Sequence, residues 1–137
     1  MKRILALDVG DKRIGIAVSD GLGITAQSVE SYTRVNEDNA DAEYILKLFK
    51  SYDAGTLLIG MPRNMNGTYG PMADKVRVFG DIMEGLGCNV VYWDERLSTV
   101  QAERILIEAD MSRKKRRKVI DKIAAATILQ SYLDAKS

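Results

Sequence analysis

The sequence predicts a single α/β domain built on a mixed five-stranded sheet, in which an antiparallel three-stranded meander is followed by parallel strands, with helices on both faces. Three β-like runs separated by short turns open the chain, and apolar runs then alternate with segments of helical period. The 137 residues, 46% apolar and 28% charged, suit one soluble globular domain. We therefore take residues 1–137 as one domain.

The meander is predicted by the first 33 residues. Residues 3–9 and 13–19 are β-like runs on either side of Gly10-Asp11, a dipeptide suited to a tight turn. Another turn leads to residues 24–33, which we interpret as a third strand. Short turns between consecutive strands predict antiparallel pairing.

Helices and buried strands then alternate. Residues 38–52 carry apolar side chains at helical spacing, and residues 56–61 form a continuous apolar run, typical of a strand buried on both faces. Pro71 suits the first position of a second helix, which ends at the glycines near residue 86. The run 88–93 predicts the fifth strand, so the later strands are joined by helical crossovers.

Two helices complete the predicted chain. Ser98 stands three residues before Gln101, the spacing of a capping box, and the helix that it starts is expected to reach about residue 109. Apolar side chains recur at helical spacing from residue 120 to residue 132 and predict the last helix.

Charge is distributed unevenly along the chain. The first 110 residues carry 17 acidic and 12 basic side chains, whereas the last 27 carry eight basic and two acidic ones. Most of the basic excess lies in six consecutive cations, residues 113–118. Their mutual repulsion favours a solvated loop or the start of a helix. By itself this run fits either a wet surface or a nucleic-acid contact. Its members are Arg113, Lys114, Lys115, Arg116, Arg117 and Lys118.

The composition excludes several classes of function. The chain has no histidine, which removes histidine-based triads and histidine-ligated zinc. Cys88, the single cysteine, cannot form an internal disulfide and fits a small buried side chain. Asp8 interrupts the first apolar stretch before it reaches the length of a signal peptide, and no run approaches the ~20 residues of a membrane span. We therefore expect a cytoplasmic protein with no membrane partner.

Three acids are candidate metal ligands. Asp8 lies in an otherwise apolar strand, where an ionised carboxylate needs a partner or a cation. Glu95 directly follows the fifth strand, at the edge where α/β sheets bind ligands, and small side chains after Asp121 allow its helix to approach the sheet. Such a cluster favours Mg²⁺ or Mn²⁺, and two ions ~3.5–4 Å apart can activate water for phosphodiester cleavage. The alternative is that each acid pairs locally.

The chain also resembles the YqgF (RuvX) family, known as a pre-16S rRNA nuclease and as a Holliday junction resolvase. The resemblance covers essentially the whole chain. Its motifs are Asp8-x-Gly10-x-Lys12-Arg13-Ile14-Gly15, Gly60-x-Pro62-x-Asn64-x-x-Gly67-x-x-Gly70-Pro71, Asp94-Glu95-Arg96-Leu97-Ser98-Thr99 and Asp121-x-x-Ala124-Ala125.

This resemblance implies a ribonuclease H-like fold in which Asp8, Glu95 and Asp121 are the catalytic, metal-binding acids. It further implies Mg²⁺-dependent trimming of the 5′ end of precursor 16S rRNA, with the ribosomal small subunit as a partner. The sequence departs from the family pattern at Arg63, Asn66 and Ser98, where an aliphatic residue, an aspartate and a threonine are usual.

Several basic or polar residues are candidate substrate contacts. Lys12 and Arg13 follow the first turn and suit phosphate oxygens, or belong to a solvated turn. Arg96 either binds the scissile phosphate or pairs with a neighbouring acid, and Asn64 is a weak candidate. The basic run lies just before Asp121 in the sequence, so it could bind phosphate near the acids. Its candidate substrate contacts are Arg113, Lys114, Arg116 and Arg117.

Three other interpretations compete with rRNA processing. Cleavage of branched DNA would use the same metal chemistry and would need a two-fold dimer, and the sequence leaves monomer and homodimer open. The Asp8-x-Gly10 turn also resembles that of actin-like and sugar-kinase ATP-binding domains, but those proteins normally need two such domains. A non-catalytic nucleic-acid-binding module is the third alternative.

Overall fold

The structure is a computed structural model that describes residues 2–110 and 113–136, except the side chains of residues 101, 107, 108, 110 and 113–118. Its elements follow the predicted order, with one short 3-10 helix, η1, between β5 and α3. The elements are β1 Arg3–Val9, β2 Arg13–Ser19, β3 Ala26–Thr33, α1 Asp38–Ser51, β4 Ala54–Met61, α2 Pro71–Gly85, β5 Val90–Asp94, η1 Glu95–Leu97, α3 Val100–Asp110 and α4 Arg113–Lys136.

The five strands form one mixed sheet in the order β3-β2-β1-β4-β5. The β1–β2 and β2–β3 pairs are antiparallel, and the β1–β4 and β4–β5 pairs are parallel, as predicted. The third strand begins at Ala26, later than the predicted residue 24. Asp20 accepts hydrogen bonds from the backbone N–H groups of Ile24 and Thr25, which holds this segment as a turn.

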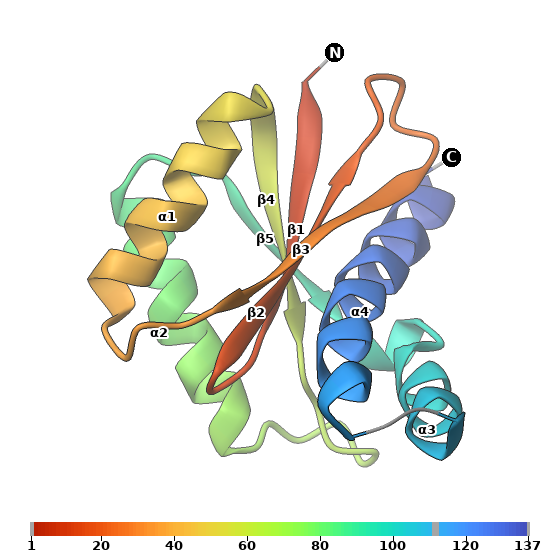
Figure 1. Cartoon of the computed structure of the whole chain (residues 1–137). Helices are drawn as coiled ribbons and strands as arrows, with labels where there is room; N and C mark the ends of the chain where they lie inside the picture. Colours follow the sequence, from red (N-terminus) through yellow and green to blue (C-terminus); the bar gives the residue numbers. More distant parts are fainter. Residues whose placement is uncertain (1, 111–112, 137) are drawn as a thin grey trace.

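Helices cover both faces of the sheet, with α1 and α2 on one face and α4 on the other (Figure 1). The larger core lies under α1 and α2 and includes Leu7, Ile45 and Phe79, all essentially buried. A smaller core lies between the sheet and α4, where Ala125 and Ile128 are fully buried. Helix α3 packs beside α4 (Figure 1). The small alanine side chains let α4 approach the sheet closely.

The basic run starts a helix. The backbone of α4 is helical from Arg113 onward, so of the two predicted alternatives the chain takes the helix start. Lysine and arginine are good helix formers, which offsets part of their mutual repulsion. The side chains of this run lie outside the described part of the structure.

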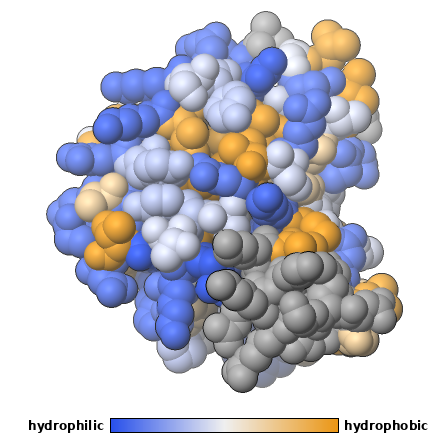
Figure 2. All heavy atoms as spheres, in the orientation of Figure 1, coloured by the Kyte–Doolittle hydropathy of each residue, from blue (hydrophilic) through white to orange (hydrophobic). Residues whose placement is uncertain are grey.

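Charged and polar side chains dominate the face shown in Figure 2, and apolar side chains occur there in separate patches. No helix in the described ranges is both long enough and apolar enough to cross a membrane.

Candidate active site

The fold brings the three predicted acids to one edge of the sheet. Asp8 is the penultimate residue of β1, and Glu95 begins η1 directly after β5. Because β1, β4 and β5 are parallel, their carboxyl ends lie together, in the lower half of Figure 1. Asp121 reaches this edge from α4, next to Gly15 of β2, and Gly15 is the register partner of Asp8.

Asp8 and Glu95 form a close, largely buried acid pair. Their side chains are 14% and 7% exposed. Burial, and then the Asp8 carboxylate, raise the pKa of Glu95 from 4.5 to about 7. Two carboxylates this close cannot both ionise at low cost unless a cation accompanies them.

Arg104 of α3 supplies a cation to this pair. Its Nη2 donates to Asp8 Oδ2 over 3.0 Å, and its Nη1 lies 3.7 Å from Glu95 Oε2. Burial alone would lower the pKa of Arg104, but Asp8, Glu95 and Asp121 outweigh it, and the net shift is upward. Sequence reasoning missed this residue. The one signal available was that Arg104 is the only basic residue between residues 98 and 109.

The Asp121 carboxylate is engaged by other partners. Arg13 Nε donates to Asp121 Oδ2 over 2.6 Å, and Ser31 Oγ donates to the same oxygen over 3.0 Å. In residues 2–110 and 113–136, no three carboxylate or thiol side chains are grouped closely enough to hold a metal ion together. The structure thus joins Asp8 to Glu95 and places Asp121 near them, with its carboxylate bound to residues of β2 and β3.

The acid pair nevertheless fits a hard divalent cation. Mg²⁺ prefers oxygen donors and is commonly held by one or two carboxylates together with water and substrate phosphates. Asp8 and Glu95 supply such oxygens at a site where burial makes their negative charge costly. The guanidinium of Arg104 already occupies the position of a counter-cation, which shows that this site attracts positive charge.

Most of the predicted substrate contacts that the structure describes are paired with other residues of the protein. The Lys12 side chain is exposed in the first turn, whereas Arg13 is bound to Asp121. Arg96 takes its predicted alternative and pairs with Asp94, with Nη2 2.8 Å from Asp94 Oδ2. Asn64 donates to Thr68 Oγ1 over 3.0 Å and so shapes its own loop. The side chains of Arg113, Lys114, Arg116 and Arg117 lie outside the description.

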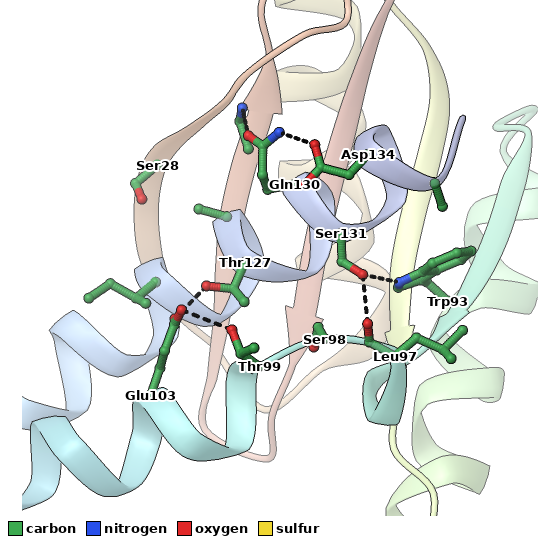
Figure 3. Close-up of a pocket in the computed structure, with 14 residues that line it drawn as sticks. Ser28, Trp93, Leu97, Ser98, Thr99, Glu103, Thr127, Gln130, Ser131 and Asp134 are labelled. Carbon is green, nitrogen blue, oxygen red and sulfur yellow. Dashed lines mark hydrogen bonds between the residues drawn. The ribbon is translucent and has the colours of Figure 1, made fainter. Parts of the chain in front are cut away.

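A separate groove of about 770 Å³ lies between η1, α3 and α4 (Figure 3). Ser131 Oγ accepts from Trp93 Nε1 over 3.1 Å and donates to the Leu97 carbonyl over 3.0 Å, and Thr127 bonds to Glu103 beside them. None of the described residues that line this groove is a lysine or an arginine. Its chemistry therefore does not suit the phosphates of a nucleic acid.

Comparison with known proteins identifies the family. The family model described as "RuvX: Holliday junction resolvase" matches residues 2–135. The chain belongs to the RuvX family. Relatives named "Putative pre-16S rRNA nuclease" occur in Heliobacterium modesticaldum, 53% identical over 98% of this chain and 91% of the relative, and in Clostridium botulinum, 51% identical over 98% of each. This RuvX chain is accordingly a nuclease.

Solved structures show the same fold at low sequence identity. RuvC from T. thermophilus, in complex with a Holliday junction substrate, matches with a TM-score of 0.61 at 11% identity, over 100% of the RuvX chain and 98% of RuvC. The yeast mitochondrial Holliday junction resolvase Ydc2 matches with a TM-score of 0.55 at 10% identity, over 96% and 78% of the two chains. The predicted ribonuclease H-like fold is confirmed.

Proposed function

We propose that this RuvX protein is a divalent-metal-dependent nuclease that processes the 5′ end of precursor 16S rRNA in the cytoplasm. The observation that carries this proposal is the buried Asp8–Glu95 pair, whose charge is balanced in the structure by Arg104. An acid pair at the carboxyl edge of a sheet is an expensive arrangement that a bound cation makes favourable.

Asp8 and Glu95 would hold Mg²⁺ or Mn²⁺, and Asp121 would join them once its carboxylate leaves Arg13. When bound, such an ion supplies a Lewis acid that activates water and stabilises charge on phosphate oxygens. Arg104 balances the charge of the acid pair before the ion arrives, and Arg13 holds the Asp121 carboxylate within reach. Release of these two arginines would leave both cations close to an incoming phosphate.

The basic run at the start of α4 would add affinity for the nucleic-acid backbone. Its residues occupy the same helix as Asp121, and Arg117 lies four positions before Asp121, a rise of about 6 Å along the helix axis. Cations so near the acids would offset the repulsion between carboxylates and substrate phosphates.

The relatives support rRNA as the substrate, since proteins about 50% identical over nearly the whole chain carry the pre-16S rRNA nuclease name. The description of the family model supports a second candidate, the resolution of four-way DNA junctions. The metal chemistry would be the same, whereas symmetric junction cleavage would require a two-fold dimer.

A paired cleavage assay tests the proposal. The purified protein is incubated with a 5′-extended 16S rRNA precursor or with a four-way DNA junction, in Mg²⁺ or in excess chelator. We expect cleavage of the precursor in Mg²⁺ alone, and its loss in Asp8→Asn and Glu95→Gln. Glu43→Gln, an exposed acid on α1, is the matched control and should cut normally.

Undiminished cleavage by Asp8→Asn, or equal cleavage in chelator, would overturn the proposed mechanism. Preference for the junction over the precursor would replace the rRNA substrate by branched DNA.

A further inference from the structure

Two arginines pair with Asp94 at the end of β5, and a third lines the same cavity as this carboxylate. Arg96 chelates Asp94 through Nε and Nη2, and Arg63 Nη1 lies 3.4 Å from Asp94 Oδ2. A Cβ built on Gly67 would lie 3.6 Å from guanidinium nitrogens of both Arg63 and Arg96, so the two cations flank the same loop. The third, Arg77, comes from α2.

Tyr69 holds two of these guanidinium groups. The Arg63 and Arg77 guanidinium carbons lie 4.5 and 4.4 Å from the centre of the Tyr69 ring. An aromatic face attracts a cation without neutralising it. Within the described part of the chain, no carboxylate forms an ion pair with Arg77. The positive charge of Arg77 is therefore available to a ligand.

One carboxylate, Asp94, pairs with two of the three arginines. Asp94, whose side chain is 17% exposed, pairs with both Arg63 and Arg96. The hydrogen bond from Arg96 leads the effects that lower the pKa of Asp94, so this carboxylate stays ionised. Asp81 and Glu84 also act on Tyr92 in the cavity wall, but neither forms an ion pair with Arg77 in the structure as described, so a bound anion could pair with Arg77 directly.

The cluster also encloses space for an anion. A cavity of about 240 Å³ is lined by Met61, Arg63, Tyr69, Arg77, Tyr92 and Asp94. The Tyr92 hydroxyl is buried and has no hydrogen-bond partner in the described structure. This hydroxyl lies against Gly80 of α2, where a Cβ would meet it at 2.0 Å. Met61 ends β4 and Asp94 ends β5, so the cavity lies at the same carboxyl edge of the sheet as the acid pair, on the face that α2 covers.

We propose that Arg63, Arg77 and Arg96 form a phosphate-binding site that holds a backbone phosphate of the substrate strand where the strand crosses the sheet edge that carries the acid pair. This proposal rests on the proposed nuclease function. Guanidinium groups match phosphate geometry through paired N–H donors. Contact with the Tyr69 ring holds the Arg63 and Arg77 guanidinium groups in place before the strand arrives. The site would fix the position of the strand relative to Asp8 and Glu95.

Binding without catalysis tests this site. A labelled single-stranded RNA oligonucleotide is titrated against the Asp8→Asn protein in chelator at several salt concentrations. Loss of one phosphate contact on a single strand lowers the slope of log affinity against log salt by about 0.7. We expect Arg77→Gln to lower the slope by about that amount and affinity about five- to tenfold. Arg77→Lys should retain most of the slope, and Lys47→Gln, an exposed charge on α1, should change neither quantity.

Asp94→Asn should change RNA affinity in the opposite direction to Arg77→Gln. Asparagine can still accept the Arg96 N–H bond that caps η1, so the turn should survive. Among the described residues, Asp94 is the only carboxylate paired with Arg63 and Arg96. Removing its charge frees both arginines, so RNA affinity should rise with a steeper salt slope. A purely structural role for these residues predicts that Asp94→Asn weakens binding.

An unchanged salt slope in Arg77→Gln, with normal thermal stability, would overturn the proposal, as would weaker binding by Asp94→Asn. Inorganic phosphate provides a further arm. Phosphate could raise the thermal stability of the parent protein but not that of Arg77→Gln, while both proteins show the same salt slope with RNA. That result would mean that the cavity binds free phosphate, and the proposal of a strand contact would fail. Because these assays contain no metal and measure no cleavage, their failure is distinct from failure of the nuclease assay.

Discussion

Gly15 of β2 lies directly against the backbone of Asp121 in α4. A Cβ added to Gly15 would lie 1.9 Å from the Asp121 carbonyl oxygen and 2.6 Å from its carbonyl carbon. A glycine inside a strand often marks such a close approach of another backbone. Since Gly15 is also the register partner of Asp8, this contact sets how closely α4 brings Asp121 to the acid pair.

Gly15→Ala should therefore displace α4 from the sheet. Both atoms in conflict belong to backbones, so neither can rotate away, and we expect a loss of roughly 1–3 kcal/mol in the free energy of unfolding. Cleavage should fall about 100-fold, because small displacements of catalytic groups are costly. Urea unfolding and initial cleavage rates measure the two effects. Gly85→Ala, where a Cβ would meet nothing within 4 Å, is the control, and equal behaviour of the two variants would contradict this role of Gly15.

Arg104→Gln should increase metal affinity. Arg104 and a divalent ion both neutralise Asp8 and Glu95, so the side chain competes with the ion for the same oxygens. A charge-assisted hydrogen bond contributes roughly 1.5–3 kcal/mol, which predicts Mn²⁺ binding tighter by about 10- to 100-fold. Titration calorimetry with Mn²⁺ measures this, with Lys47→Gln as the charge-matched control. Weaker Mn²⁺ binding by Arg104→Gln would show that the arginine organises the site and does not compete.

The raised pKa of Glu95 predicts a pH dependence of stability in chelator. The folded protein holds this proton more tightly than the unfolded chain does, because burial and Asp8 raise the pKa from 4.5 to about 7. The resulting stabilisation is complete below about pH 4.5 and disappears as pH rises through about 7. Urea midpoints of the parent should therefore fall relative to those of Glu95→Gln between pH 5 and pH 8. Parallel curves for the two proteins would contradict the shifted pKa.

Replacing both Arg116 and Arg117 by alanine should weaken nucleic-acid binding without changing sequence preference. Each lost phosphate contact on single-stranded RNA should lower the salt slope by about 0.7, so the double variant should lose up to about 1.4. Fluorescence anisotropy with two unrelated RNA sequences measures slope and preference together. If affinity and slope stay as in the parent, the basic run is a solvated surface.

The edge where the acids meet was predictable from local patterns. Strand periodicity placed Asp8 near the end of β1, and the apolar run before Asp94 placed Glu95 at the end of β5. Parallel pairing then brings the two strand ends together. These inferences need only the identity of each element and the direction of its strand.

The side-chain pairings at the site were not predictable in the same way. Arg104 meets Asp8 across 96 residues, and Arg13 meets Asp121 across 108. Such contacts depend on the angles at which α3 and α4 pack, which no local pattern encodes. The contacts of Arg63 and Arg77 with the Tyr69 ring likewise depend on the conformation of the loop before α2. Sequence reasoning thus located the acids but not the arginines that balance them.

Anomalous diffraction from a crystal of the protein soaked in Mn²⁺ tests the metal site most directly. We predict a manganese peak between the carboxylates of Asp8 and Glu95, with the Arg104 guanidinium displaced from both. A soaked crystal that shows no manganese at these carboxylates, with Arg104 still bound to Asp8, would contradict the account.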